Sequence, residues 1–354
     1  MVHIILFSVI IIAINARKDK KESLFFCFCI LYLFSALRYD YGNDYNAYYA
    51  IHENIKNGVT AIQADEPIFF LLNFIIPDYY FFIAITSIPL LLVVYKLIKN
   101  HVDYRYIGVA VFIFVINPYL FLMSLSAIKQ TLAMVLFIIA TYFSKRKKII
   151  PYILLILIAT LIHASAIILL PFYFVANEKK VGIIQLVVFL MGVLILLLGW
   201  DLFDEFFSNL IIALFDDPNY IRYFEQDRQN TIRATLLTSV TGIYLLLNIR
   251  KLEGASLMCA KLYLIGIALG VLAYRVSMLT RFQMYFDIFS VVAIPSILQT
   301  NKEPKIEEPE WLVILNKFVF PLLIFVIYLA RYYSFFTNSL WEAFFTYKTI
   351  LRIL

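Results

Sequence analysis

Charged residues are scarce in this chain, at 15% of 354 residues, whereas a soluble domain carries about 25%. Hydrophobic residues make up 63%, and the mean hydropathy is +0.85. A soluble fold of this length has no interior large enough to bury that much apolar surface, and a disordered chain contains far less of it. The composition therefore predicts an all-α integral membrane protein that crosses the bilayer many times.

Cysteine, glycine and proline are also rare, at 3, 10 and 11 residues. Cys27, Cys29 and Cys259 all fall inside apolar runs, so the sequence predicts neither a disulfide nor a zinc site. No glycine-rich phosphate loop, Ser-His-Asp order or Cys/His metal spacing is present in the sequence. We therefore expect no metal and no other cofactor, and the scarcity of flexible linkers favours a single membrane domain over residues 1–354.

The net charge of +6 is not typical of nucleic-acid binding, because the basic residues form short clusters between apolar runs. Such clusters mark cytoplasmic loops, and residues 145–148 form the strongest one. Residues 3–15 resemble a signal-peptide core, but no basic residue precedes them and four basic residues follow at 17–21. We therefore expect residues 3–15 to belong to a first membrane helix. The distribution of the basic residues also predicts that the protein has no nucleic-acid partner.

Eleven runs are apolar enough to be read as membrane spans, which need about 20 residues each. They are residues 1–16, 23–38, 79–98, 104–123, 127–144, 149–176, 181–200, 232–249, 256–274, 281–299 and 311–330. Residues 68–76 are too short to span and are read as a re-entrant or interfacial piece. The basic clusters then place two larger loops outside, at 38–66 and 201–231.

The segment 149–176 decides the helix count, because a single crossing there would put Lys179 and Lys180 outside, against the charge rule. A pair of short helices that enters the membrane as far as His163 and then returns to the same side keeps Lys179 and Lys180 inside, in agreement with the charge rule. The alternative is one tilted helix with His163 at mid-membrane. The two alternatives give a bundle of about eleven to twelve helices.

Polar and aromatic side chains gather where the first outer loop begins. Arg38 stands at a helix end, Gly42 permits a tight turn, and Asp40 and Asp44 are four residues apart. Aromatic rings stack on sugars and carboxylates accept hydrogen bonds from sugar hydroxyls, so this segment is a candidate sugar site. An interfacial aromatic belt with an arginine anchor is the alternative. The tyrosines of the segment are Tyr41, Tyr45, Tyr48 and Tyr49.

Other candidate groups lie at the outer ends of later spans. Lys129, with Gln130 beside it, either binds phosphate as a point charge or extends its side chain to the interface. His163 is either a general base for a sugar hydroxyl or a histidine satisfied by hydrogen bonds within the bundle. Arg275 and Arg281 flank a short outer turn, and their guanidinium groups suit bidentate phosphate contacts.

Taken in chain order, several of these segments resemble one known family. They are Arg38 with Gly42-Asn43-Asp44-Tyr45, Glu66-Pro67-Ile68-Phe69, Ala127 to Ala133, His163-Ala164-Ser165-Ala166, and Arg281 with Tyr285-Phe286 and Pro295. The chain resembles the EpsG-like group of polysaccharide polymerases, which includes Wzy-type O-antigen and capsule polymerases. Lys129 departs from the pattern, since the family usually has arginine there and lysine lacks the bidentate fork.

The resemblance implies a GT-C-like glycosyltransferase in the bacterial inner membrane that joins undecaprenyl-diphosphate-linked oligosaccharides at the periplasmic face. The growing chain would be the donor and a new repeat unit the acceptor. Membrane lipid is an expected partner, and a chain-length regulator and a flippase are candidate partner proteins. The implied roles are base for His163 or Asp44, diphosphate binding for Arg38, Lys129, Arg275 and Arg281, and sugar binding for Tyr45, Tyr48 and Gln130.

Three other functions remain open at this point. An O-antigen ligase, or another lipid-dependent glycosyltransferase, would share the outer face and the cationic residues. A flippase for the same lipids would spread its cations over both halves, whereas here they gather at one face and no inverted repeat is evident. A membrane O-acetyltransferase would also use an intramembrane histidine, but its acyl donor is cytoplasmic.

Overall fold

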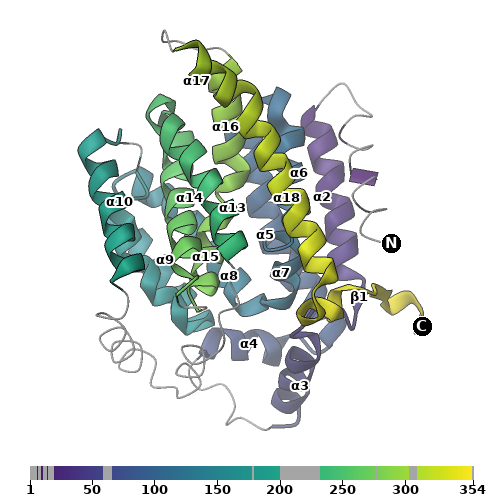
Figure 1. Cartoon of the computed structure of the whole chain (residues 1–354). Helices are drawn as coiled ribbons and strands as arrows, with labels where there is room; N and C mark the ends of the chain where they lie inside the picture. Colours follow the sequence, from purple (N-terminus) through teal and green to yellow (C-terminus); the bar gives the residue numbers. More distant parts are fainter. Residues whose placement is uncertain are drawn as a thin grey trace. The chain divides into compact units, whose positions relative to one another are not determined.

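The computed structural model describes residues 6, 9, 10, 14, 20–58, 66–177, 179–199, 232–275, 278–302 and 309–352. Within these ranges the chain is helical apart from its turns and a two-stranded pair (Figure 1). Its contacts form two compact units, Met1–Phe174 with Tyr328–Leu354, and Val175–Ile327. The all-α class is confirmed, while the single-domain prediction is not tested by this division. The predicted loop 201–231 and most of the span 1–16 lie outside the described residues.

Four helices in the described ranges are long and apolar enough to cross a bilayer alone. They are α5 (Tyr79–His101), α8 (Ile128–Lys145), α14 (Gly254–Leu272) and the continuous run Glu310–Thr337. That run comprises α17 (Glu310–Ile314), a π-helical turn η5 (Leu315–Val319) and α18 (Phe320–Thr337). The pair α15 (Leu279–Asp287) and α16 (Ser290–Lys302), bent by 54°, makes a fifth span if counted as one. The chain is therefore a multi-pass membrane protein.

The other predicted spans that fall within the described residues form shorter helices. A helix rises about 1.5 Å per residue, so a segment of 10–17 residues falls short of a hydrocarbon core about 30 Å thick. Proline explains one break, because Pro118 has no N–H to continue the helix that ends at Ile116. The count of eleven to twelve spans therefore stays a prediction. The shorter elements are α2 (Lys20–Ala36), η2 (Tyr104–Tyr106), α6 (Ile107–Ile116), α7 (Phe121–Ser126), α10 (Ile183–Leu198), α13 (Ile232–Asn248) and η4 (Ile249–Lys251).

The segment 149–176 folds as the predicted hairpin of two short helices. α9 (Ile149–Ile162) ends at His163, whose backbone is extended, and η3 (Ala164–Phe174) runs back beside it. Near the open end, the Tyr152 hydroxyl donates to the Leu169 carbonyl at 2.6 Å, and the Tyr152 and Tyr173 rings lie 5.3 Å apart. Each arm is about 21–22 Å long, which is shorter than a hydrocarbon core about 30 Å thick, and His163 lies at the tip between the two arms.

The C-terminal segment pairs with the start of the predicted first outer loop, residues 38–66. β1 (Arg38–Tyr39) pairs antiparallel with β2 (Lys348–Thr349), and η6 (Ser339–Phe344) and η7 (Ile350–Arg352) flank β2. Gly42 has φ +111°, which glycine adopts readily, and its N–H donates to the Ala343 carbonyl at 3.3 Å. Contacts with residues more than 300 positions away therefore fix the shape of the start of this loop.

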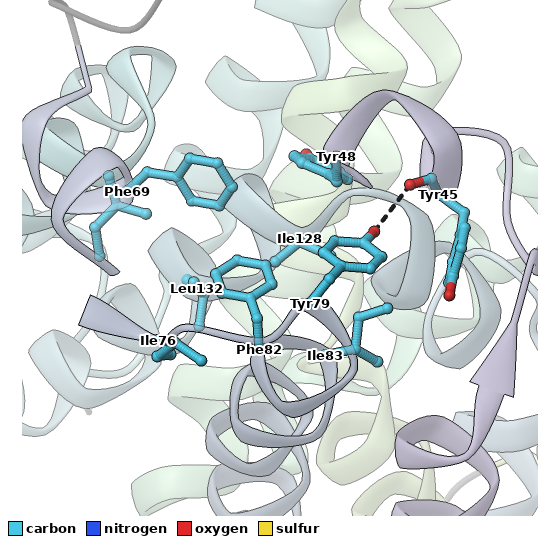
Figure 2. Packing of buried hydrophobic residues seen from close by; sticks show 10 residues of the cluster. Tyr45, Tyr48, Phe69, Ile76, Tyr79, Phe82, Ile83, Ile128 and Leu132 are labelled. Carbon is cyan, nitrogen blue, oxygen red and sulfur yellow. Dashed lines mark hydrogen bonds between the residues drawn. The ribbon is translucent and has the colours of Figure 1, made fainter. Parts of the chain in front are cut away.

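The short helix α3 (Tyr45–Lys56) lies within this predicted loop, and the short helix α4 (Pro67–Ile75) follows it. α4 lies across the direction of α2 and α5, whereas those two run side by side (Figure 1). A buried apolar cluster packs α3 and α4 against α5, α8 and α9 (Figure 2), and it comprises Tyr45, Tyr48, Phe69, Ile76, Tyr79, Phe82, Ile83, Ile128, Leu132 and Ile162. This packing fixes the N-terminal end of α4 relative to α8 and the hairpin tip.

Cysteine labelling tests the hairpin topology in a variant that lacks Cys27, Cys29 and Cys259. We expect a cysteine introduced at residue 163 to react with a membrane-impermeant thiol reagent from outside, because the charge rule predicts the hairpin tip at the outer face. Cysteines at residues 147 and 174 should react only after permeabilisation, because the same rule predicts that both arms end at the cytoplasmic side. Labelling of residue 174 from outside would instead indicate a single tilted span.

Candidate functional site

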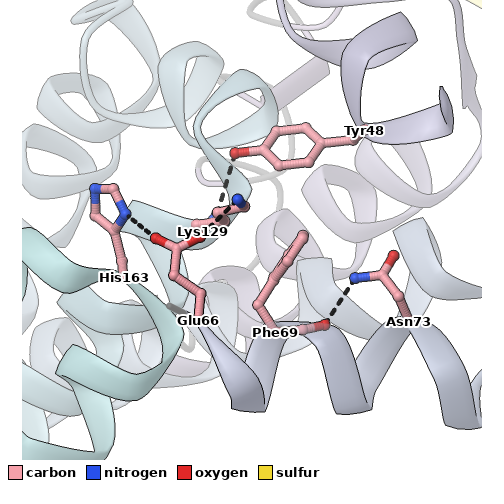
Figure 3. Close-up of polar contacts among 6 residues, drawn as sticks. All are labelled: Tyr48, Glu66, Phe69, Asn73, Lys129 and His163. Carbon is pink, nitrogen blue, oxygen red and sulfur yellow. Dashed lines mark hydrogen bonds and ion pairs between the residues drawn. The ribbon is translucent and has the colours of Figure 1, made fainter. Parts of the chain in front are cut away.

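One carboxylate joins three segments that are distant in the sequence (Figure 3). Glu66 Oε1 lies 2.9 Å from Nδ1 of His163, and Glu66 Oε2 lies 2.6 Å from Nζ of Lys129. The three side chains are 15%, 22% and 16% exposed in the order Glu66, His163 and Lys129. A ligand can therefore reach the group, while the partial burial strengthens the charge interactions within it.

Each member of this group stands at an end or a break of a helix. Glu66 precedes α4, where Pro67 occupies the first helical position and suits it because that position needs no N–H donor. Lys129 is the second residue of α8, and His163 is the extended residue between α9 and η3. Side chains at such breaks project past the helix ends, and here all three point toward one another.

Glu66 is ionised at neutral pH. Its burial alone raises the pKa, but the hydrogen bond from His163 and the positive charge of Lys129 outweigh this effect and lower the pKa below its usual value. An ionised carboxylate is only an acceptor, so Nδ1 of His163 is the donor in this pair. Nε2 then carries the lone pair, and within the described residues it has no hydrogen-bond partner.

Lys129 is surrounded by further groups that stabilise a cation. Its Nζ lies 4.8 Å from the centre of the Phe69 ring, in a cation–π contact. Its backbone N–H donates to the Tyr48 hydroxyl at 3.5 Å, which ties the first turn of α8 to α3. These contacts hold the ammonium group toward Glu66.

Asp44, the other predicted base, lies at the N-terminus of α3 and is exposed. The Ser126 hydroxyl donates to its carboxylate at 3.1 Å and accepts from its backbone N–H at 3.0 Å. Ser126 is the last residue of α7, two positions before α8. Asp44 is therefore attached to the turn from which Lys129 projects.

The three predicted sugar-binding residues are largely buried. Tyr45, Tyr48 and Gln130 are 4%, 9% and 7% exposed. The Tyr45 ring packs edge-on against Tyr79 and the Tyr48 ring against Phe69, both within the cluster of Figure 2. In this conformation both rings are packed inside the protein, and their sugar-binding role stays a prediction.

Arg38 is 2% exposed and lies inside the protein. Its Nη1 donates to the Ser35 carbonyl at 2.7 Å and to the Ser87 hydroxyl at 3.2 Å, and its Nη2 donates to the Leu125 carbonyl at 3.1 Å. Ser35 and Leu125 lie in the last turns of α2 and α7, where helix dipoles attract a cation. Arg38 therefore joins two helix ends beside the site, and its predicted diphosphate contact is untested.

Arg275 and Arg281 belong to the second compact unit. Arg275 follows the end of α14 and is partly exposed, and Arg281 lies in the first turn of α15 and is exposed. The two arginines flank one short turn, as expected. Their position relative to Glu66 is not described, so their diphosphate-binding role stays a prediction.

Glu66 has no predicted role at the sequence level, although it opens one of the segments that carry the family resemblance. Its position directly before Pro67 predicts only a helix start, where an acidic residue is common, so the sequence held no specific signal for its role. Its two partners lie 63 and 97 positions further along the chain. Only the folding of α8 and the hairpin brings these partners to it.

Comparison with known proteins gives one match. The model of the EpsG family matches residues 21–349, nearly the whole chain. No curated protein and no solved structure matches the chain. The matched range includes Glu66, Lys129 and His163, together with Arg275 and Arg281 of the second unit.

Substitution of Arg38 by alanine should destabilise the protein by about 3 kcal/mol, because it leaves buried carbonyls of two helix ends without a donor. Thermal unfolding in detergent measures this effect. Arg105→Ala is the matched control, because Arg105 pairs with Asp103 at the surface and such a pair contributes less than about 1 kcal/mol. Equal stability of the two variants would contradict the structural role assigned to Arg38.

Proposed function

Because the chain belongs to the EpsG family of polysaccharide-polymerase-like membrane proteins, we propose that it polymerises undecaprenyl-diphosphate-linked oligosaccharide repeat units. The product is O-antigen or capsular polysaccharide, made at the periplasmic face of the bacterial inner membrane. The basic residues 145–148 support this orientation, because they follow the end of α8 opposite to Lys129.

The Glu66–His163 pair is the observation that carries this proposal. The carboxylate accepts from Nδ1, which fixes the tautomer and the orientation of the ring, and Nε2 is left to accept a proton. A base of this kind matches a reaction in which a sugar hydroxyl becomes a nucleophile. His163 is therefore the preferred base of the two predicted ones.

The reaction forms one bond and breaks one. The acceptor hydroxyl oxygen attacks the anomeric carbon of the donor sugar, and His163 Nε2 takes the hydroxyl proton. The bond from the anomeric carbon to the diphosphate oxygen breaks, and undecaprenyl diphosphate leaves with the electron pair. The positive charge of Lys129 stabilises the charge that develops on this leaving group. Diphosphate binding by Arg275 and Arg281 stays a prediction from the sequence.

Gene deletion in the native host tests this function. The surface polysaccharide should stop at one repeat unit on a silver-stained gel and return to long chains with the wild-type gene. His163→Ala and Glu66→Gln should fail to restore long chains, because loss of a positioned base slows such a step about 10²–10⁴-fold.

His101→Ala, in the last turn of α5, is the matched control and should restore long chains at equal expression. Loss of all linked repeats in the deletion strain would indicate a ligase or a flippase. Unchanged polysaccharide would exclude the polymerase and favour the acetyltransferase.

A further inference from the structure

We propose that Glu66 holds Lys129 in the resting site and releases it to the donor diphosphate, so that donor binding itself activates His163. This inference rests on the proposed function, since it concerns how the same site takes its diphosphate substrate. It assigns Glu66 a second role, as a competitor that occupies the phosphate-binding cation before the substrate arrives.

Glu66 has two partners, and only one of them, the Lys129 ammonium group, carries a positive charge while His163 is neutral. Oε2 faces the Lys129 ammonium at 2.6 Å, while Oε1 faces His163 at 2.9 Å. Because separate oxygens make the two contacts, the first can break while the second persists (Figure 3). The guanidinium group of an arginine would bind both carboxylate oxygens at once, whereas the lysine ammonium group binds a single oxygen and leaves the other to His163.

Lys129 is suited to exchange one anion for another. Its ammonium group ends a flexible four-carbon chain and is 16% exposed, so a short movement brings it to a ligand. A diphosphate carries more negative charge than a carboxylate and attracts the ammonium group more strongly at the same distance. The Phe69 ring, 4.8 Å from Nζ, stabilises the cation next to the site.

Release of Lys129 changes the charge that His163 experiences. While the ion pair is closed, the ammonium group offsets much of the Glu66 charge. When the diphosphate takes the ammonium group, Glu66 faces His163 alone and stabilises an imidazolium ion more strongly. His163 therefore accepts the hydroxyl proton most readily when a donor occupies the site.

Binding of farnesyl diphosphate to the purified full-length protein tests this inference without requiring turnover. Glu66→Gln removes the competing charge and keeps the shape, so it should bind the probe about three- to tenfold more tightly than wild type. Lys129→Gln should bind it more weakly. Asp103→Asn is the control, because Asp103 pairs with Arg105 at the surface, and it should bind like wild type.

Equal or weaker binding by Glu66→Gln would overturn the inference, because an ordinary substrate-binding residue loses affinity when it is replaced. A second measurement uses the wild-type protein in case that variant does not fold. NMR titration of the histidine ring signals, with His163→Ala to assign the signal of residue 163, should show that the bound probe makes this ring more basic while it stays neutral at pH 7 and free to take the hydroxyl proton. An unchanged titration of this ring would also overturn the inference.

The polymerase function can fail separately from this inference. Glu66→Gln could bind the probe more tightly while the deletion strain makes unchanged polysaccharide. These results would still support the exchange of Lys129 between Glu66 and a diphosphate. The same pair of results would reject the polymerisation of repeat units.

Discussion

The Glu66 carboxylate is the interaction on which the site depends. It joins the start of α4, the start of α8 and the tip of the α9–η3 hairpin through contacts of 2.6 and 2.9 Å. A partly buried carboxylate is costly without compensation, and here an ammonium group and an imidazole N–H supply it. Without this charge, Lys129 and His163 would have no common partner, and the hairpin tip would lose its polar contact with the start of α4.

The surrounding scaffold holds these contacts in place. The buried cluster packs α3, α4 and α5 together, while Arg38 joins the ends of α2 and α7 through hydrogen bonds. The C-terminal strand adds a third support by pairing with the start of the outer loop. Precise placement of reacting groups needs such support, because a site displaced by about 1 Å loses much of its activity.

The sequence predicted the class of fold and part of the site. The distribution of basic residues between successive loops favoured the hairpin at 149–176. The position of His163 within an apolar segment identified this histidine as a candidate base. The role of Glu66 could not be predicted, because its partners meet it only through tertiary contacts. Burial of Arg38, Tyr45 and Tyr48 was also missed, since a run of aromatic residues with near-helical spacing does not reveal which faces find partners.

A double-mutant cycle tests the central claim most directly, namely that Glu66 and His163 act as one unit. The turnover rate is measured with a lipid-linked repeat unit for Glu66→Gln, His163→Ala and the double variant. If Glu66 acts through His163, the double variant should be no slower than His163→Ala alone. Rate losses that multiply in the double variant would show that the two residues act independently and would contradict this account.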